Sequence, residues 1–184
     1  MNPSCSMFRR FLVAMALAAP VCGCRDRTAI VDVAAETAVV DSVIRFAAIH
    51  WAMRKDTAAM FRHFAHDSTL FWFSPDSAGT LRGFETQRRL VEQVFMNPAF
   101  VAVGSDFRDM RIHLSRGGDV AWWSSIIDDR NTWQGRPASW ENVRWTGVAE
   151  KRDGVWVIRQ MHFSKSEEAM TRELRPAERP LRTS

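Results

Sequence analysis

The stretch from Val143 to Ser164 decides how this chain folds, and it reads VRWTGVAEKRDGVWVIRQMHFS. Two runs rich in Val, Ile and Trp flank Asp153-Gly154, and an Asp-Gly pair between such runs is a strong signal for a β-hairpin. We expect a three-residue loop with Gly154 in the left-handed region. That register gathers seven side chains on one face of the hairpin, namely Arg144, Thr146, Val148, Trp156, Ile158, Gln160 and His162. A sheet face packed on a core is normally apolar, so this polar mixture predicts a lined cavity.

The rest of the chain predicts helices first and strands after them. Apolar residues recur at helical spacing from Val39 to Trp51, and Asp56 stands where the N-cap of a second helix is expected. In chain order we expect helices near 39–51 and 57–64, strands at 70–73 and 80–82, a helix from 84 to 96, and strands at 107–114, 120–133, 140–151 and 155–164. Helices followed by a strand meander indicate an α+β fold with the helices on one face of the sheet.

Charge and cysteine content narrow the class of protein. The 184 residues include 25 basic and 21 acidic side chains, and no Lys/Arg run of the kind that follows a phosphate backbone. We therefore expect no nucleic-acid partner. All three cysteines, Cys5, Cys22 and Cys24, lie within the first 24 residues, so a disulfide framework in the folded domain is excluded.

The N-terminal segment predicts export. Arg9-Arg10 form a positive region ahead of the apolar run Phe11 to Ala19, which is too short to span a bilayer. The following Val21-Cys22-Gly23-Cys24 resembles a bacterial lipobox, in which the last Cys carries the lipid. This resemblance implies a protein lipid-anchored to the cell envelope through Cys24, on the periplasmic side of the inner or the outer membrane. The alternative is a plain signal peptide that makes Cys24 incidental.

The order of elements resembles the nuclear transport factor two-like superfamily, and within it the SnoaL-like domains. The resemblance covers about residues 35–166, and it includes Trp51 with Asp56, Ser74-Pro75 before Leu81-Arg82-Gly83, Asp119-Val-Ala-Trp122, Arg144-x-Thr146-x-Val148 and His162-x-Ser164. It implies a cone-shaped α+β fold, with three N-terminal helices packed on a curved, mainly antiparallel sheet, and a pocket at the wide end. Dimers are common among such proteins, and their functions differ widely.

The expected domains are a signal peptide with lipobox at 1–23, a tether at 24–33, the SnoaL-like domain at 34–166 and a flexible tail at 167–184. In the pocket we expect Arg144, His162, Trp122, Thr146 and Trp156 to contact a small, partly apolar ligand, either neutral or anionic. Arg144 would hold an anion bidentately, or else form an internal ion pair. No cofactor and no metal ion is expected, since His63 and His66 lack a third ligand.

Two other functions stay open. The first is an isomerase, dehydratase or cyclase in which His162 acts with Asp128 in acid–base chemistry. The chain has no Tyr, so the ketosteroid isomerase arrangement of a Tyr and a neutral Asp as oxyanion donors cannot be copied. The second is an interaction module with a filled pocket. The sheet face opposite the predicted cavity carries Trp123 and Trp145, and paired aromatic residues on an outer face predict a homodimer through that face.

Overall fold

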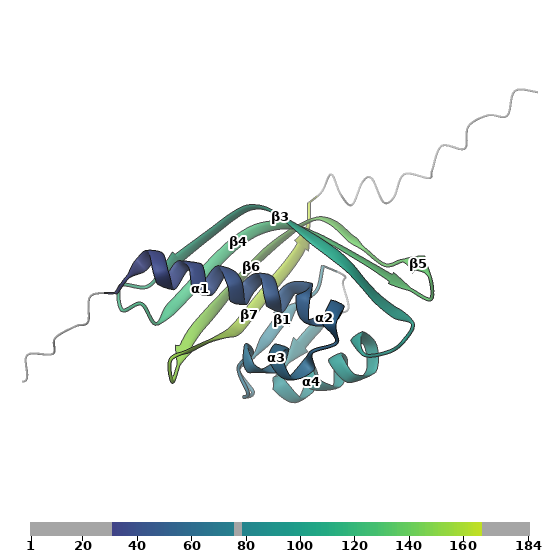
Figure 1. The fold of residues 1–184 in the computed structure, drawn as a ribbon, viewed down its shortest axis with the longest axis horizontal. Helices are drawn as coiled ribbons and strands as arrows, with labels where there is room; N and C mark the ends of the chain where they lie inside the picture. The colour runs from purple at the N-terminus through teal and green to yellow at the C-terminus, as the bar shows by residue number, and fades with distance from the viewer. Residues whose placement is uncertain (1–30, 76–78, 167–184) are drawn as a thin grey trace, which may run out of the picture. The chain divides into compact units, whose positions relative to one another are not determined.

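The computed structural model describes residues 31–75 and 79–166, which form a group of short helices against a seven-stranded sheet (Figure 1). The predicted signal peptide with Cys24, most of the tether, and the tail at 167–184 lie outside the described residues. Among the residues described, no helix is both long and apolar enough to cross a membrane.

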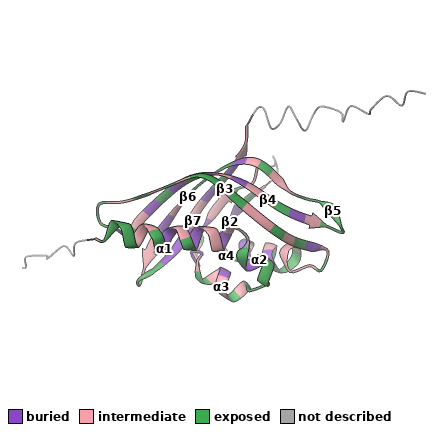
Figure 2. Cartoon of the chain, turned by 45° about the horizontal axis from the view of Figure 1, so that its top comes forward, coloured by how far each residue is buried: buried purple, intermediate pink, exposed green. Residues whose placement is uncertain are grey.

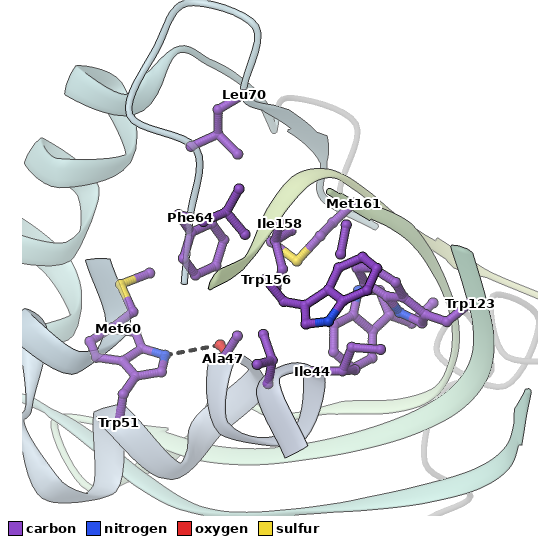
Figure 3. Packing of buried hydrophobic residues seen from close by; sticks show 14 of the residues in the cluster. Ile44, Ala47, Trp51, Met60, Phe64, Leu70, Trp123, Trp156, Ile158 and Met161 are labelled. Atoms are coloured by element: carbon purple, nitrogen blue, oxygen red, sulfur yellow. Dashed lines mark hydrogen bonds between the residues drawn. The ribbon is translucent and has the colours of Figure 1, made fainter. Parts of the chain in front are cut away.

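The first helical segment is longer than the apolar pattern predicts. It comprises α1 (Val33–Arg45), a π-helical turn η1 (Phe46–His50) and α2 (Trp51–Arg54). Asp32 caps its start by accepting a hydrogen bond from the Ala35 N–H at 3.0 Å. Farther along, the buried Trp51 indole donates to the Ala47 carbonyl at 3.0 Å (Figure 3). The segment ends at Lys55, whose φ of 56° lies in the left-handed region.

The second and third predicted helices form where they are expected. Asp56 caps α3 (Thr57–Arg62), because its side chain accepts from the Ala59 N–H at 2.9 Å, which confirms the predicted N-cap. The third helix comprises α4 (Phe84–Leu90) and the π-helical η2 (Val91–Phe95). Lys55 joins these two regions, since its Nζ donates to the carbonyl of Phe95 at 2.5 Å.

The sheet is mixed, with a predominantly antiparallel order of β2-β1-β7-β6-β4-β3. Its strands are β1 (Phe71–Phe73), β2 (Thr80–Arg82), β3 (Phe100–Leu114), β4 (Val120–Trp133), β5 (Arg136–Pro137), β6 (Trp140–Arg152) and β7 (Val155–Lys165). The meander β3-β4-β6-β7 confirms the predicted strand order. β1 adds to it in parallel against β7. The strand β3 begins seven residues earlier than predicted, and the short β5 pairs with β4 where only a turn was expected.

The helices cover the sheet face opposite to the one that the hairpin argument predicts. Burial alternates along the strands (Figure 2), and Val143, Trp123 and Trp145 lie inside, with Trp145 0% and Trp123 2% exposed. Arg144, Thr146 and Trp122 lie on the outer face, where Trp122 is 46% exposed. The predicted assignment of the two faces is therefore wrong. Because the side-chain period of a strand is two, one wrong choice of face moves every side chain of that strand.

A β-bulge in β7 explains why the hairpin side chains that were expected on one face lie on two faces of the sheet. The turn has two residues, with φ of 49° at Asp153 and 81° at Gly154, and Arg152 pairs with Val155. Farther along, Ala149 pairs with Ile158 while Val148 pairs with Gln160, so Arg159 is an extra residue in β7. Side chains before the bulge, such as Trp156 and Ile158, point inward, whereas His162 points outward. They do not share the single face that the three-residue loop predicted.

Candidate functional site

A cavity of about 160 Å³ lies between the helices and the inner face of the sheet. Residues of η1, α2, α3, α4 and η2 form its helical side, and residues of β1, β3, β4, β6 and β7 form its sheet side. Exposed Ala138 and half-buried Trp140 are among its lining residues, which marks the β4–β6 end as the side facing solvent. Its volume is close to that of an engineered protein cavity of about 150 Å³ that binds benzene. The space suits a molecule of about one ring.

Aromatic side chains are the largest group in the wall. They are Trp51, Phe64, Trp72, Phe95, Phe100, Trp140, Trp145 and Phe163. Phe163 connects three of the others, with ring centroids 5.5 Å from Trp145, 5.7 Å from Trp72 and 5.4 Å from Trp140. Such interlocked rings hold one another in fixed positions, so the wall is preorganised. Alanine, methionine and isoleucine side chains complete it, as Ala47, Ala48, Ala52, Met60, Ile127, Ala138 and Met161.

Three polar side chains interrupt this apolar wall: Gln87, Asp129 and Asn131. The side-chain oxygen of Gln87 has a hydrogen-bond partner, because Oε1 accepts from the Trp72 indole at 2.9 Å. Asn131 donates from Nδ2 to Oδ2 of Asp129 at 2.8 Å. A carboxylate oxygen only accepts, so this contact fixes which end of the Asn131 amide is nitrogen. The remaining oxygens, Oδ1 of Asp129 and Oδ1 of Asn131, are buried and accept no hydrogen bond within the described residues.

Burial raises the pKa of Asp129 from 3.8 to about 6. The cost of taking its charge out of water is the main cause. The hydrogen bond from Asn131 and the charge of Arg130 act in the opposite direction and lower the pKa by less. The guanidinium of Arg130 is on the exposed side of β4, where it pairs with Asp106. Among the residues that the structure describes, Asp129 therefore has no ion-pair partner within the cavity.

Asn131 is held in place by the backbone around it. Its N–H donates to Oγ of Ser139 at 3.1 Å, and its carbonyl accepts from the Ala138 N–H at 2.9 Å and from the Ser139 hydroxyl at 3.2 Å. The residue is only 7% exposed. These backbone contacts and the hydrogen bond from Nδ2 to Asp129 hold the residue in one position, as a preorganised site requires.

The predicted site residues lie elsewhere, and most of them share the outer face. Thr146 pairs with His162 across β6 and β7, and the His162 ring packs edge-on against Phe73 at 5.7 Å. Arg144 donates from Nη2 to the Lys165 carbonyl at 2.9 Å. Trp122 stacks on His113. The structure thus brings Arg144, Thr146, His162 and Trp122 to one face, as predicted, but that face is outside the cavity.

The predicted pair of Asp128 and His162 is not formed. Asp128 accepts from Arg108 at 3.1 Å and from the Asn142 N–H at 2.6 Å, both on the outer side of the sheet. Trp156 is buried, as a pocket wall residue would be, but it does not line the cavity. Its indole donates to Oε2 of Glu36 at 2.8 Å. These differences have two causes. The even-numbered residues of β4 were expected to face the cavity, and the bulge in β7 was not expected.

The sequence did contain a signal for the residues that were missed. Asp129 and Asn131 have the same strand parity as Trp123 and Ile127, so apolar alternation alone places them inside. Gln87 precedes buried Val91 by four residues, which is helical spacing for one face. The prediction placed the cavity on the other face because the polar groups of the hairpin were expected to line it. Among the residues described, no group of three or more His, Cys, Asp or Glu side chains is arranged to hold a metal ion.

Comparisons with known proteins agree on the fold. The family model described as SnoaL-like domain matches residues 40–166. An NTF2-like protein from Cytophaga hutchinsonii aligns at 13% identity with a TM-score of 0.54, covering 71% of this chain and 97% of that one. An NTF2-like protein of unknown function from Pseudomonas putida aligns at 17% identity and a TM-score of 0.52, covering 72% and 87%. A hexachlorocyclohexane dehydrochlorinase from Novosphingobium barchaimii aligns at 17% identity and a TM-score of 0.53, covering 71% and 86%.

No curated protein matches the sequence. At these identities the structural matches bear on fold alone, and the NTF2-like α+β fold is the one that the sequence predicted.

Proposed function

The chain belongs to the SnoaL-like domain family, and from this premise we propose that its cavity binds a small, largely apolar molecule of about one ring. The family includes ligand-binding members as well as isomerases and dehydratases. One observation carries the proposal: among the described residues, a cavity of about 160 Å³ has a wall of aromatic and aliphatic side chains that only Gln87, Asp129 and Asn131 interrupt. Apolar cavities of this size bind one-ring molecules.

The position of the charged groups changes the expected ligand. An anionic ligand was expected because Arg144 was placed in the pocket. Within the described residues, no Lys, Arg or His side chain lines the cavity, and its only ionisable lining group is the acid Asp129. We therefore propose a neutral or hydrogen-bond-donating ligand in place of an anionic one.

A thermal-shift series with the full-length protein tests the binding proposal. Toluene, benzyl alcohol and benzylamine serve as one-ring probes, and at least one of them raises Tm with increasing concentration, as ligands of a native state do. Ala138→Phe, which adds bulk at an exposed lining position, abolishes the shift. Arg136→Phe, an exposed change in the same hairpin but outside the lining, leaves it intact. A set of flat titrations for all three probes overturns the proposal.

A second function is favoured by the pKa of Asp129. A carboxyl group that lines the cavity and has a pKa of about 6 is suited to accept and return a proton near neutral pH. We propose this isomerase- or dehydratase-type chemistry as the alternative, with Asp129 in the role that the sequence assigned to Asp128 and His162. Deuterium exchange at the carbon next to the carbonyl of phenylacetone, followed by NMR, tests it. Exchange that is equally fast with the Asp129→Asn variant excludes the role.

Envelope anchoring through Cys24 is a further part of the proposal, and it rests on the sequence alone. Arg9-Arg10, the apolar run Phe11 to Ala19 and the lipobox-like Val21 to Cys24 support it. Two or more acyl chains on one residue give stable membrane attachment. Mass spectrometry of the mature N-terminus from a bacterial host is expected to show acylated Cys24, and Cys24→Ser is expected to release the protein from membranes. An unmodified Cys24 contradicts the anchor.

A homodimer also stays a proposal, with a different contact surface. Trp123 and Trp145 are buried in the core of the domain, so they cannot form the contact that the sequence predicted. The outer face instead presents Trp122, 46% exposed, on the strand next to Arg144 and Thr146. We propose that this outer face of β4 and β6 makes the dimer contact.

A further inference from the structure

A second hollow, apart from the aromatic cavity, is an open groove between α1 and α3, two helices that cover the inner face of the sheet (Figure 1). Its volume is about 580 Å³, which lies within the range of about 300–1,000 Å³ that small-molecule sites occupy. Eight residues line it, and none of them lines the aromatic cavity. A protein interface takes about 20–30 residues a side, so the size of the groove favours a small ligand.

The α1 side of the groove is apolar. Val43 is buried at its base, Phe46 is half-buried, and Val39 is 50% exposed although it is a large apolar side chain. The small side chains of Ala38 and Ala59 also line the groove and leave the space between the helices open. Removing apolar surface of this kind from water is favourable, so this side of the groove suits the apolar body of a ligand.

The α3 side of the groove carries a cation that has no anionic partner within the described residues. Arg62, the last residue of α3, is exposed and makes no hydrogen bond, ion pair or ring contact with the part of the chain that the structure describes. Arg45 on α1, by contrast, pairs with Asp41 at 2.9 Å. Among the described residues no acidic side chain lines the groove. The positive charge of Arg62 is therefore available to an anion.

His63, next to Arg62, holds the groove in shape. Its Nδ1 donates to the Trp156 carbonyl at 3.3 Å, because a carbonyl oxygen only accepts. Its own carbonyl accepts from the Ile158 N–H at 2.8 Å. Its ring packs edge-on against Phe46, with the centroids 6.0 Å apart. His63 thus ties α3 to both β7 and α1, so the groove is formed before a ligand arrives, which lowers the cost of binding.

We propose that this groove binds a small amphiphilic carboxylate, with its carboxylate on Arg62 and its alkyl chain along Val39, Val43 and Phe46. The site is separate from the proposed binding function of the cavity and does not depend on it. A planar guanidinium matches a carboxylate through two parallel hydrogen bonds. An ammonium head group would be repelled by Arg62, and a neutral amphiphile would gain the apolar contact without the charge.

Isothermal titration of the full-length protein at pH 7.5 with probes of equal chain length tests this site. We expect octanoate to bind at least about ten-fold more tightly than 1-octanol or octylamine, since charge-assisted hydrogen bonds are about twice as strong as neutral ones. Acetate, which has the head group without the chain, is expected to show no binding. Arg62→Gln should weaken octanoate binding about ten-fold or more and leave that of 1-octanol unchanged. Arg54→Gln, exposed on α2 outside the lining, should change neither.

Two further variants locate the site. Val39→Glu places a negative charge in the groove and is expected to abolish octanoate binding, whereas Val33→Glu, exposed on the same helix outside the lining, retains it. Ala138→Phe, which obstructs the aromatic cavity, is also expected to retain it, and a loss in that variant overturns the assignment to the groove.

The ranking of the probes decides the ligand class. Octanol or octylamine binding as tightly as octanoate overturns the carboxylate proposal, as does full octanoate affinity in a folded Arg62→Gln protein. Absence of octanoate binding overturns the groove site and leaves the cavity function, which one-ring probes test, standing. Flat titrations with the one-ring probes alone have the opposite meaning.

Discussion

Asn131 donates its amide hydrogen to Asp129 across 2.8 Å, two residues apart on the same face of β4. The contact pairs a carboxyl group with a neutral amide, and among the described residues Asp129 forms no ion pair, since Arg130 pairs with Asp106. Each side chain keeps one buried oxygen free. Stability alone does not explain such a pair, because a hydrophobic replacement would remove both unsatisfied groups. Polar groups left open at a cost are typical of functional sites.

Asp129→Asn is expected to stabilise the protein at neutral pH. In the native state the pKa of Asp129 is about 6, above its ordinary value of 3.8, so between about pH 4 and 6 the native state binds more protons than the unfolded chain. Its contribution to the free energy of unfolding therefore falls as the pH rises through this window. The loss amounts to at most about 3 kcal/mol. Urea unfolding from pH 4 to 7.5 measures this loss. The free energy of unfolding of Asp129→Asn should exceed that of the wild type by an amount that grows as the pH rises.

Other carboxyl groups have a lowered pKa in the native state, so their contributions to stability change with pH in the opposite direction. These contributions have to be subtracted. The hydrogen bonds from Thr69 and Arg152 lower the pKa of Asp67 to about 2, and those from Lys151 and Trp156 lower that of Glu36. The difference between wild type and variant isolates Asp129. Asp128→Asn, the same substitution one residue away on the outer face, serves as the matched control. A gain for Asp129→Asn that is equal at pH 4 and pH 7.5 contradicts the assignment.

Gly147→Ala tests which face of the sheet is inside. A methyl group at Gly147 would lie 2.2 Å from the Trp123 ring and 2.6 Å from the Gln160 carbonyl oxygen. Overpacking of this kind costs about 1–3 kcal/mol or more. Thermal unfolding should show the loss, and Trp123→Leu should restore part of it, so that the double variant is more stable than the sum of the single changes predicts. Strict additivity would mean that Trp123 does not cover Gly147.

Asp56→Ala removes the cap of α3, the helix that carries the cavity residue Met60. The hydrogen bond from Asp56 to the Ala59 N–H at 2.9 Å is lost, and N-cap losses cost about 1 kcal/mol. Asp56→Asn keeps an acceptor at the same place and should cost only a few tenths of that value. Denaturant midpoints compare the two. Equal losses in both variants would show that the charge matters and the cap does not.

Trp122→Glu tests the proposed dimer face. A charge at this exposed outer-face position should disrupt a contact centred on Trp122 and His113, which stack at 5.8 Å. Static light scattering is expected to give a dimer mass for the wild type and a monomer mass for the variant at equal concentration. Val155→Glu, exposed at the hairpin turn, should leave the dimer intact. A monomeric wild type contradicts the proposal directly.

The candidate site was only partly predictable, and its own residues show why. The hairpin with Asp153-Gly154, the N-cap at Asp56 and the strand from Val120 to Trp133 follow from local turn chemistry, capping and alternation, and the structure has all three. A choice between Asp128 and Asp129 depends instead on which face of β4 meets the helices. The odd-numbered parity of Trp123 and Ile127 was evidence for Asp129. Polar residues at the even-numbered positions of the strand favoured Asp128 instead.

The amino-acid sequence by itself determined the α+β class, the order of the elements and the meander, because periodicity, caps and turn residues act over a few residues. Only the tertiary structure decided the direction of each side chain. The extra residue Arg159 shifts the register of β7 between Ile158 and Gln160, and a one-residue shift exchanges the two faces of a strand. Packing of the helices against Trp123 and Trp145 then selects the inner face. Asp129 and Asn131 line the cavity for that reason, while Arg144 and His162 lie outside it.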